Sequence, residues 1–187
     1  MKKINLLVVF FFISSISIFA QQSETNYSLA KNEVKINMSN LIGFKFFDVG
    51  YEKILNEEST IGVNILFNLD KNSDSSNFDE YRTFSITPYY RHFFSNKYAS
   101  GFFVEVFTML HSGKENLGLV YADFPPYGSF AQYEKYTDFA VGISAGAKFV
   151  SKRGFVAEIY LGIGRDLLDN DENEVVGRGG VAIGYRF

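Results

Sequence analysis

The sequence of 187 residues contains no cysteine and no tryptophan, and it has three prolines. The absence of cysteine excludes disulfide bonds, thiolate-ligated zinc or iron–sulfur centres, a thiol nucleophile and a lipid-modified N-terminal cysteine. The chain also lacks an excess of positive charge. Its 18 basic and 21 acidic side chains give a net charge of −3, so nucleic-acid binding is not indicated. The 21 Phe and 12 Tyr instead predict a folded protein, because disordered chains lack this aromatic content.

Long apolar runs are scarce, and the main one lies near the N-terminus. Residues 1–20 are predicted to be a secretory signal peptide, with a positive region at Lys2 and Lys3, an apolar core at 6–13 and a cleavage point at Ala20. The alternative is an uncleaved anchor helix, which needs about 20 apolar residues and therefore a longer run than this one. We expect an exported chain whose residues 21–32 form a flexible periplasmic lead-in.

From residue 33 to residue 187 the sequence alternates between apolar and polar positions, which is typical of β-strands. No stretch has an apolar stripe of helical period and length. Eight strands are predicted, at about 33–42, 46–55, 59–69, 82–94, 101–111, 137–150, 154–165 and 178–187. The fold class predicted for 33–187 is therefore all-β, with eight antiparallel strands.

The two faces of these strands differ in a way that favours a transmembrane barrel. In the seventh segment Phe155, Ile159 and Ile163 lie on an apolar face, and Glu158 and Gly162 lie on a mixed face that is rich in small residues. A soluble sandwich has little use for so many glycines on a solvent face. Lipid favours an apolar outer band, and a narrow lumen favours small and paired polar side chains. We expect an up-and-down outer-membrane β-barrel.

Connection lengths and aromatic positions give the same prediction. From the second connection onward short and long connections alternate, as they do between the periplasmic and outer ends of such barrels. With both termini in the periplasm, the longest connection, 112–136, becomes an outer loop. Phenylalanines on the apolar face gather at both predicted interfaces. The periplasmic set is Phe94, Phe102, Phe149, Phe155 and Phe187, and the outer set is Phe47, Phe67, Phe84 and Phe139.

The C-terminal residues Val181, Ile183, Tyr185 and Phe187 alternate down to a terminal aromatic. They resemble the signal by which the barrel-assembly machinery recognises outer-membrane proteins, so we expect that machinery as a partner during biogenesis. Together with TPYYR (87–91), KFVSKRGF (148–155), VGRGG (176–180) and GYRF (184–187), most of the chain resembles a family of small, functionally uncharacterised outer-membrane barrels of Gram-negative bacteria. The resemblance is to the class that includes outer-membrane proteins A and X. It implies a fold and a location, and it transfers no catalytic residue.

Pro88 conflicts with a regular fourth strand, because a closed barrel has no edge strand that tolerates a missing N–H. We expect a bulge or an unpaired carbonyl near Thr87. A bulge would exchange the two faces on one side of it, so the inward position of Arg91 depends on where the bulge lies.

Charged residues on the mixed faces are predicted to form one layer inside the barrel. They are Lys35, Glu52, Arg91, Glu105, Lys148, Glu158 and Arg186. One interpretation is a salt-bridged plug, since buried charges must be paired. The alternative is a narrow channel for ions or protons. The interior of an eight-stranded barrel is only just filled by side chains, which favours the plug.

An enzymatic interpretation depends on His111 and Ser112, because lipid-modifying acyl hydrolases of the outer membrane use a His and a Ser on a barrel wall. Adjacent strand residues point to opposite faces, so these two do not readily hydrogen-bond to each other. No acid is clearly placed to orient the imidazole. We therefore expect a non-enzymatic protein, with an outer-membrane acyl hydrolase as the alternative.

The loops carry the remaining candidates. Acidic positions in 70–74 and 169–174 have oxygen ligands that suit Ca²⁺ or Mg²⁺, but they lack the pattern of an EF-hand, so no metal or cofactor is predicted. The predicted outer loop 112–136 is rich in aromatic residues. It is a candidate recognition surface for an extracellular ligand, or it folds over the barrel mouth. Its residues are Tyr121, Phe124, Tyr127, Phe130 and Tyr133.

The function expected from the sequence is a small outer-membrane barrel that contacts lipid and presents loops outward, for interaction or envelope integrity. A soluble carrier of lipocalin type would reverse the two faces of every strand. The predicted aromatic girdles and the C-terminal pattern argue against it.

Overall fold

A computed structural model describes residues 30–69, 80–95, 97–121, 129–168 and 175–187. The predicted signal peptide and the lead-in up to residue 29 lie outside these ranges. The elements are β1 (Asn32–Asn37), α2 (Met38–Phe44), β2 (Phe46–Ile54), β3 (Ser59–Asn68), β4 (Glu80–Phe93), β5 (Gly101–Tyr121), β6 (Ser129–Val150), β7 (Phe155–Asp166) and β8 (Val175–Arg186).

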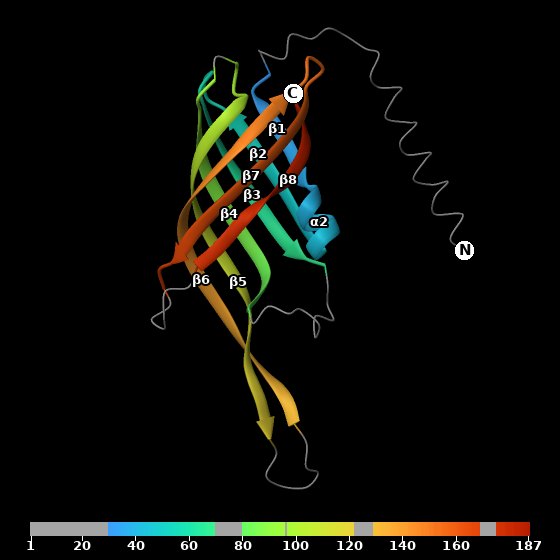
Figure 1. The fold of residues 1–187 in the computed structure, drawn as a ribbon, viewed down its shortest axis with the longest axis vertical. Coiled ribbons are helices and arrows are strands. Elements are labelled where there is room, and N and C mark those ends of the chain that lie inside the picture. Colours follow the sequence, from blue (N-terminus) through green and yellow to red (C-terminus); the bar gives the residue numbers. More distant parts are fainter. Residues whose placement is uncertain (1–29, 70–79, 96, 122–128, 169–174) are drawn as a thin grey trace, which may run out of the picture.

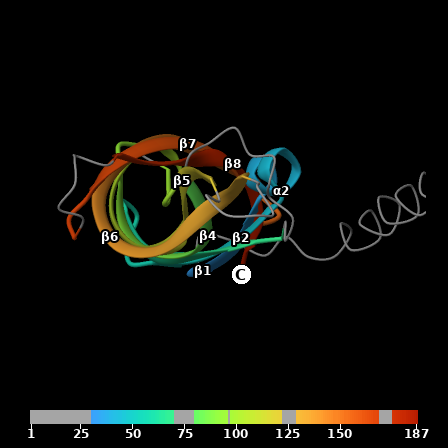
Figure 2. The ribbon, with the colours of Figure 1, turned by 90° about the horizontal axis from the view of Figure 1, so that it is seen from below.

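The eight strands form one closed antiparallel barrel in sequence order, and β1 pairs with β8 to close it. The predicted fold class is therefore confirmed. Figure 1 shows the start of β1 and the C-terminus at one end of the barrel, and the β5–β6 hairpin extending from the other. We call these the terminal end and the hairpin end. Figure 2, viewed from the hairpin end, shows the ring of strands with α2 outside it.

Apolar side chains face outward and polar side chains face inward, as the alternation predicts. On β7 the outward residues Phe155, Ile159 and Ile163 are each more than half exposed, whereas Glu158 and Tyr160 are buried. The apolar lumen of a lipocalin-type carrier is therefore not what the chain forms. Over the described ranges, no helix is long and apolar enough to cross a membrane.

Small inward residues make room for large ones, as expected for a narrow barrel. A Cβ at Gly62 would lie 2.4 Å from the Tyr89 hydroxyl oxygen, and one at Gly142 would lie 2.4 Å from Cζ of Phe107. Glycine at these positions allows aromatic rings to cross the lumen beside the backbone of a neighbouring strand.

Aromatic residues lie outward near both ends of the barrel. The terminal-end phenylalanines Phe94, Phe102, Phe149, Phe155 and Phe187 are each more than half exposed. At the hairpin end Phe47 and Phe67 are exposed, and Phe84 and Phe139 are half-buried. The rings of Phe67 and Phe84 lie 5.3 Å apart across neighbouring strands.

The predicted first strand, 33–42, is wrong beyond Asn37, because the chain turns there into the short helix α2. The Asn37 side chain accepts a hydrogen bond from the backbone N–H of Asn40, which is the N-cap geometry that starts a helix. Lys45, with a φ of 56°, ends it in the left-handed region. The strand thus passes directly into the helix, and Asn37 is both the last residue of β1 and the N-cap of α2.

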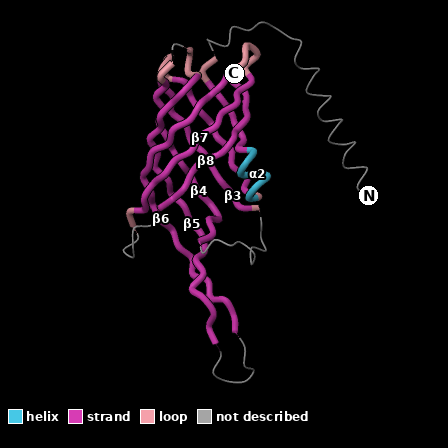
Figure 3. The backbone as a smooth tube through the Cα atoms, viewed as in Figure 1, coloured by secondary structure: helices cyan, strands magenta, loops and turns pink. Residues whose placement is uncertain are grey.

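The predicted loop 112–136 is also wrong for most of its length. The ladder between β5 and β6 continues to the pair Tyr121 and Ser129, with one irregularity between Asn116 and Leu119. Figure 3 shows the two strands projecting beyond the barrel as a twisted ribbon. The connection is therefore a long hairpin rather than an irregular loop.

No bulge lies at Thr87, but the ladder between β4 and β5 lacks a pair at Thr87 and at Pro88, which agrees with the second alternative, an unpaired carbonyl. The register between β4 and β5 shifts between Arg82 and Phe84, and the ladder has the same register on both sides of Pro88. The faces therefore do not exchange between Pro88 and the end of the strand. Arg91 is fully buried inside the barrel.

Candidate functional site

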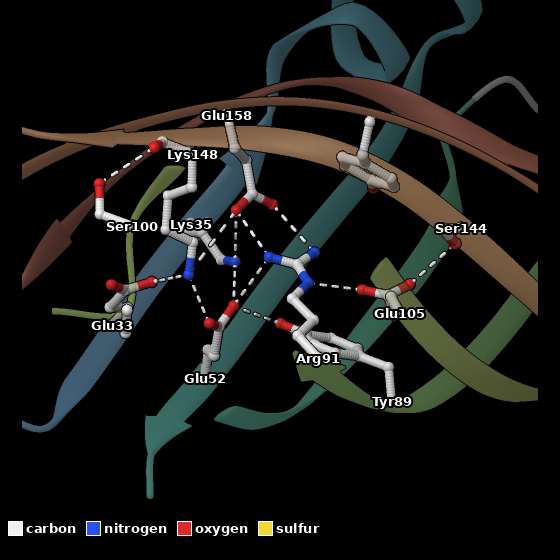
Figure 4. A network of polar contacts seen from close by, with 12 residues as sticks. Glu33, Lys35, Glu52, Tyr89, Arg91, Ser100, Glu105, Ser144, Lys148 and Glu158 are labelled. Atoms are coloured by element: carbon white, nitrogen blue, oxygen red, sulfur yellow. Dashed lines mark hydrogen bonds and ion pairs between the residues drawn. The ribbon is translucent and has the colours of Figure 1, made fainter. Parts of the chain in front are cut away.

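The seven inward charges predicted from the sequence lie together in the lumen, and Glu33 and Arg178 join them. All nine side chains are buried, and they come from every strand except β3. We call this group the ionic cluster: Glu33, Lys35, Glu52, Arg91, Glu105, Lys148, Glu158, Arg178 and Arg186. Figure 4 shows most of it, with carboxylates and cations alternating across the lumen. Glu33 lies two positions from Lys35 on β1, and Arg178 lies eight positions from Arg186 on β8. Each pair therefore shares a strand face, so the two-residue period could have predicted both Glu33 and Arg178 to point inward.

The centre of the ionic cluster is a square of two acids and two bases. Lys35 Nζ donates to Oε2 of Glu52 at 2.5 Å and to Oε2 of Glu158 at 2.9 Å. Arg91 Nη1 donates to the same two oxygens at 3.0 and 2.7 Å. Its Nη2 also reaches Glu158 Oε1 at 3.2 Å, so the guanidinium binds this carboxylate through two nitrogens. Each charge here has at least two partners of opposite sign.

Two further groups extend the ionic cluster along the barrel axis. Toward the terminal end, Lys148 joins Glu52 to Glu33, and Arg186 Nε donates to Glu33 at 2.7 Å. Toward the hairpin end, Arg91 Nε and Arg178 both donate to Glu105, which also accepts from the Ser144 hydroxyl at 3.0 Å. These contacts form a continuous network across the lumen.

Aromatic rings surround the cations of the ionic cluster. The Arg91 guanidinium carbon lies 4.5 Å from the ring centre of Tyr89 and 4.3 Å from that of Phe103. Lys148 Nζ lies 5.0 Å from the ring centre of Phe93. The rings exclude water from the cations. The ion pairs of the network and the cation–π attraction to the rings together compensate the cations for this lost hydration.

A second polar group, which the sequence interpretation missed, lies nearer the hairpin end. Asp48 accepts hydrogen bonds from the side-chain amides of Asn37 at 3.0 Å, Asn40 at 2.8 Å and Asn64 at 3.1 Å. Asn37 also contacts the Tyr160 hydroxyl at 3.2 Å. We call these five residues the amide cluster. Asparagine is common in turns, so its alternation with apolar residues only weakly indicates that these side chains face the lumen.

His111 faces the lumen and is almost completely buried. Its Nε2 lies 2.8 Å from Oδ1 of Asp166, so the expectation that no acid orients this imidazole is wrong. Ser112 lies on the opposite face, as expected, and the buried Ser85 is the cross-strand partner of His111. His111 Nδ1 has no hydrogen-bond partner within the described part of the chain, so no serine–histidine hydrogen bond is formed there.

The C-terminal residues close the barrel. Val181, Ile183, Tyr185 and Phe187 all face outward. Phe187 and Asn32 exchange two backbone hydrogen bonds, of 2.8 and 3.1 Å. The pattern that resembles an assembly signal therefore belongs to the strand that completes the barrel.

Most loop candidates are not described. Phe124, Tyr127 and the acidic positions in 70–74 and 169–174 lie outside the described residues. Tyr121, Phe130 and Tyr133 lie on the strands of the β5–β6 hairpin. Among the residues that the structure describes, no group of three or more metal-ligating side chains is arranged to hold a metal ion.

A family model described as "Protein of unknown function (DUF3575)" matches residues 6–186. The match spans nearly the whole sequence, and the chain belongs to this family. Neither a curated protein nor a solved structure is similar enough to give a match.

Proposed function

We propose that this DUF3575 member is a small, non-enzymatic β-barrel of the bacterial outer membrane, closed inside by the ionic cluster. It presents the β5–β6 hairpin and the neighbouring loops outward, for interaction or envelope integrity. The observation that carries the proposal is that the strand faces are inverted relative to those of a soluble protein, with apolar side chains outside and paired charges inside.

Exposure of the outer wall supports a lipid environment. Leu161 is 78% exposed and Ile143 is 60% exposed, in the middle of two neighbouring strands. Soluble monomers rarely expose contiguous apolar patches of more than a few hundred Å². Outward phenylalanines near both ends of the barrel suit the two interfaces of a bilayer.

The ionic cluster supports a closed lumen over a conducting one. Its charges contact one another directly, as in the 2.7 Å contact between Arg91 and Glu158, and aromatic rings fill the space beside them. An ion that passed through the lumen would have to separate these ion pairs, and separating buried ion pairs costs a large free energy. A closed barrel that acts through its outer surface and hairpin fits this interior best.

The surroundings of His111 support a non-enzymatic role. An acyl hydrolase acting on membrane lipid needs its nucleophile and base accessible from the lipid side. His111 and Ser85 instead face the lumen and are buried. The buried contact between His111 and Asp166 suits a structural link between β5 and β7.

Membrane fractionation combined with heat modifiability tests the proposal. We expect the protein in the outer-membrane fraction, extracted by detergent and not by salt, with a gel mobility that changes on boiling. Protease added to intact cells is expected to cleave the β5–β6 hairpin and spare the barrel. Recovery in the salt-washed soluble fraction would contradict the membrane location, and stable single-channel currents would contradict the closed lumen.

A further inference from the structure

The wall of the barrel is incomplete between β8 and β2. On β1, Glu33–Asn37 pairs with Arg186–Ala182, and the strand then ends. Among the described strands, 175–181 of β8 therefore has no partner on the side of β1, although it pairs with β7 on its other side. β2 likewise extends past β1 toward the hairpin end, from Asp48 to Phe46. We call the line along which β8, β1 and β2 meet the seam. At the terminal end the seam is a continuous strand ladder, and at the hairpin end the ladder is open.

Helix α2 covers this opening. It lies beside β2 and β8 on the outside of the ring (Figure 2). The Ser39 hydroxyl oxygen accepts a hydrogen bond from the backbone N–H of Val181 at 2.9 Å, where a strand carbonyl would otherwise accept it. The Asn40 side chain reaches Asp48 behind the helix at 2.8 Å. A few polar contacts thus hold α2 where other parts of the wall have a continuous ladder.

Apolar packing makes only part of the closure. Met38 and Leu41 of α2 are half-buried, no residue of the helix is fully buried, and Ile42 is 75% exposed. Gly43 of α2 and Gly177 of β8 are exposed, and a Cβ at either would meet no atom of the described chain within 4 Å. The outer rim of the opening is therefore exposed on both of its sides, whereas behind it a Cβ at Gly180 would lie 2.5 Å from the Ser39 hydroxyl oxygen.

The amide cluster lies directly behind α2. Asp48 links Asn40 of the helix to Asn64 of β3 through its two carboxylate oxygens. Asn64 Oδ1 is a buried atom with no hydrogen-bond partner in the part of the chain that the structure describes. A buried polar atom without a partner carries a desolvation cost that a ligand can remove.

We propose that the opening between β8 and β2 is a lateral port, closed by α2, through which the headgroup of a membrane amphiphile reaches the amide cluster. The proposal rests on the proposed membrane location, because the amphiphile enters from the lipid that surrounds the barrel. Its chain would lie on the exposed apolar rim beside Ile42 and Phe44. Its headgroup would replace the contacts that hold the helix closed.

The amide cluster favours a headgroup with hydroxyl groups, as in a glycolipid. Side-chain amides offer both donors and acceptors, which match hydroxyl groups. The one carboxylate in the cluster, Asp48, accepts from amides at both oxygens and would repel a phosphate. A sugar therefore fits this site better than an anionic headgroup does.

Single cysteines provide a clean test because the chain has none of its own. Asn64→Cys places a thiol behind α2, Ser144→Cys places one on the inner wall away from the seam, and Leu161→Cys places one on the outer wall. Each variant, folded in lipid vesicles and heat-modifiable, is treated with an alkyl glycoside that carries a maleimide on its sugar. Each is then made again with Asn40→Ala, which removes the contact between α2 and Asp48.

We expect the thiol at position 64 to react, the thiol at 161 to react faster, and the thiol at 144 to stay unmodified. Asn40→Ala should accelerate the reaction at 64 by about tenfold, the effect on an opening equilibrium of losing one hydrogen bond to a carboxylate. The reaction at 161 should not change. If the Asn64→Cys chain does not fold, Gly50→Cys replaces it, since a Cβ at Gly50 would lie 2.9 Å from Asn64 Oδ1.

Two results would overturn the port while leaving the membrane location intact. One is a thiol at 64 that is inert toward the glycoside in both backgrounds while 161 reacts. The other is a thiol at 64 modified faster by a water-soluble maleimide than by the glycoside, which would indicate entry through the barrel mouth. An inert thiol at 161 would instead overturn the membrane location, and the port with it.

Competition separates the headgroup from the chain. An unreactive alkyl glycoside should slow the modification at position 64, and a phosphocholine detergent with the same chain should slow it less. The reverse order would overturn the assignment of a hydroxyl-rich headgroup.

Discussion

The two halves of the lumen are built differently. The ionic cluster joins seven of the eight strands, and around its members at the terminal end the wall is a complete ladder. At the hairpin end, the amide cluster has one charged member, Asp48, and it lies behind a helix that replaces part of the wall. Both regions are polar and enclosed, yet one is held by ion pairs across the barrel and the other by neutral amides beside the seam.

The difference indicates where the protein resists change and where it can move. Separating the ionic cluster leaves several buried charges without partners, so local opening there is costly. Releasing α2 breaks a few hydrogen bonds and exposes the apolar surface of two half-buried residues, Met38 and Leu41, while no residue of the helix is fully buried. Local opening draws on such weakly held segments, and α2 is therefore the segment expected to open first.

Removing one acid from the ionic cluster should have the largest effect. Glu52→Ala leaves Lys35, Lys148 and Arg91 short of a partner in a dry interior. The expected loss of stability is about 3–5 kcal/mol, measured by denaturant unfolding in detergent micelles. Glu57→Ala, in the exposed turn after the same strand, is the control and should change stability by less than about 0.5 kcal/mol. Equal midpoints for the two variants would mean that the cluster does not determine stability.

A pair of glycines tests the difference between the inner and outer faces of the wall. Gly142→Ala places a Cβ 2.4 Å from the ring of Phe107 and 2.5 Å from the carbonyl oxygen of Ile163, and a backbone atom has little freedom to shift. We expect a loss of about 1–3 kcal/mol. Gly177→Ala, at the rim of the opening, meets no described atom within 4 Å and should leave the unfolding midpoint near that of the wild type. A similar loss for both variants would contradict the outward position of Gly177.

The terminal end could be predicted from the sequence and the hairpin end much less well. Charges such as Glu105 and Glu158 interrupt apolar strands, and these interruptions determine which face points inward. Helix α2 is too short for a helical period to be seen, and it depends on the cap at Asn37. In the hairpin beyond the barrel, Lys114 lies opposite Lys135, so charge complementarity does not signal this pairing. Backbone hydrogen bonds between β5 and β6, rather than burial of an apolar face, therefore hold this part of the hairpin together.

Among the inward charges, the strand positions could be predicted but the partners could not. A two-residue period shows that Lys35 and Glu52 face the lumen. The contact between Lys35 and Glu158, by contrast, depends on the barrel being closed through β8. His111 and Asp166 come from strands that are not neighbours, and their contact across the lumen has no counterpart in sequence spacing.

Loosening the seam should have a smaller and more local effect. Asn37→Ala removes the N-cap of α2 and the amide bonds to Asp48 and to the Gly179 carbonyl. The cost expected from a lost cap is about 1 kcal/mol. Hydrogen exchange should become faster in α2 and in 177–181 of β8, while protection in β5 and β6 stays unchanged. Uniform loss of protection over all strands would show that the seam and the rest of the wall open together.

The smallest effect on stability is expected at the C-terminus, where the main change is in the rate of assembly. Phe187→Ala keeps the backbone hydrogen bonds to Asn32 and removes a side chain that is 54% exposed on the outer wall. Because little of that side chain is buried by the protein, the folded barrel should unfold at nearly the same denaturant concentration. In cells the variant should insert more slowly and be degraded more by periplasmic proteases, as pulse–chase labelling with a heat-modifiability readout would measure. Phe149→Ala, an exposed phenylalanine at the same end of the barrel, is the matched control. Slow assembly of both variants would indicate that the aromatic band as a whole, rather than the C-terminal position, determines the rate of insertion.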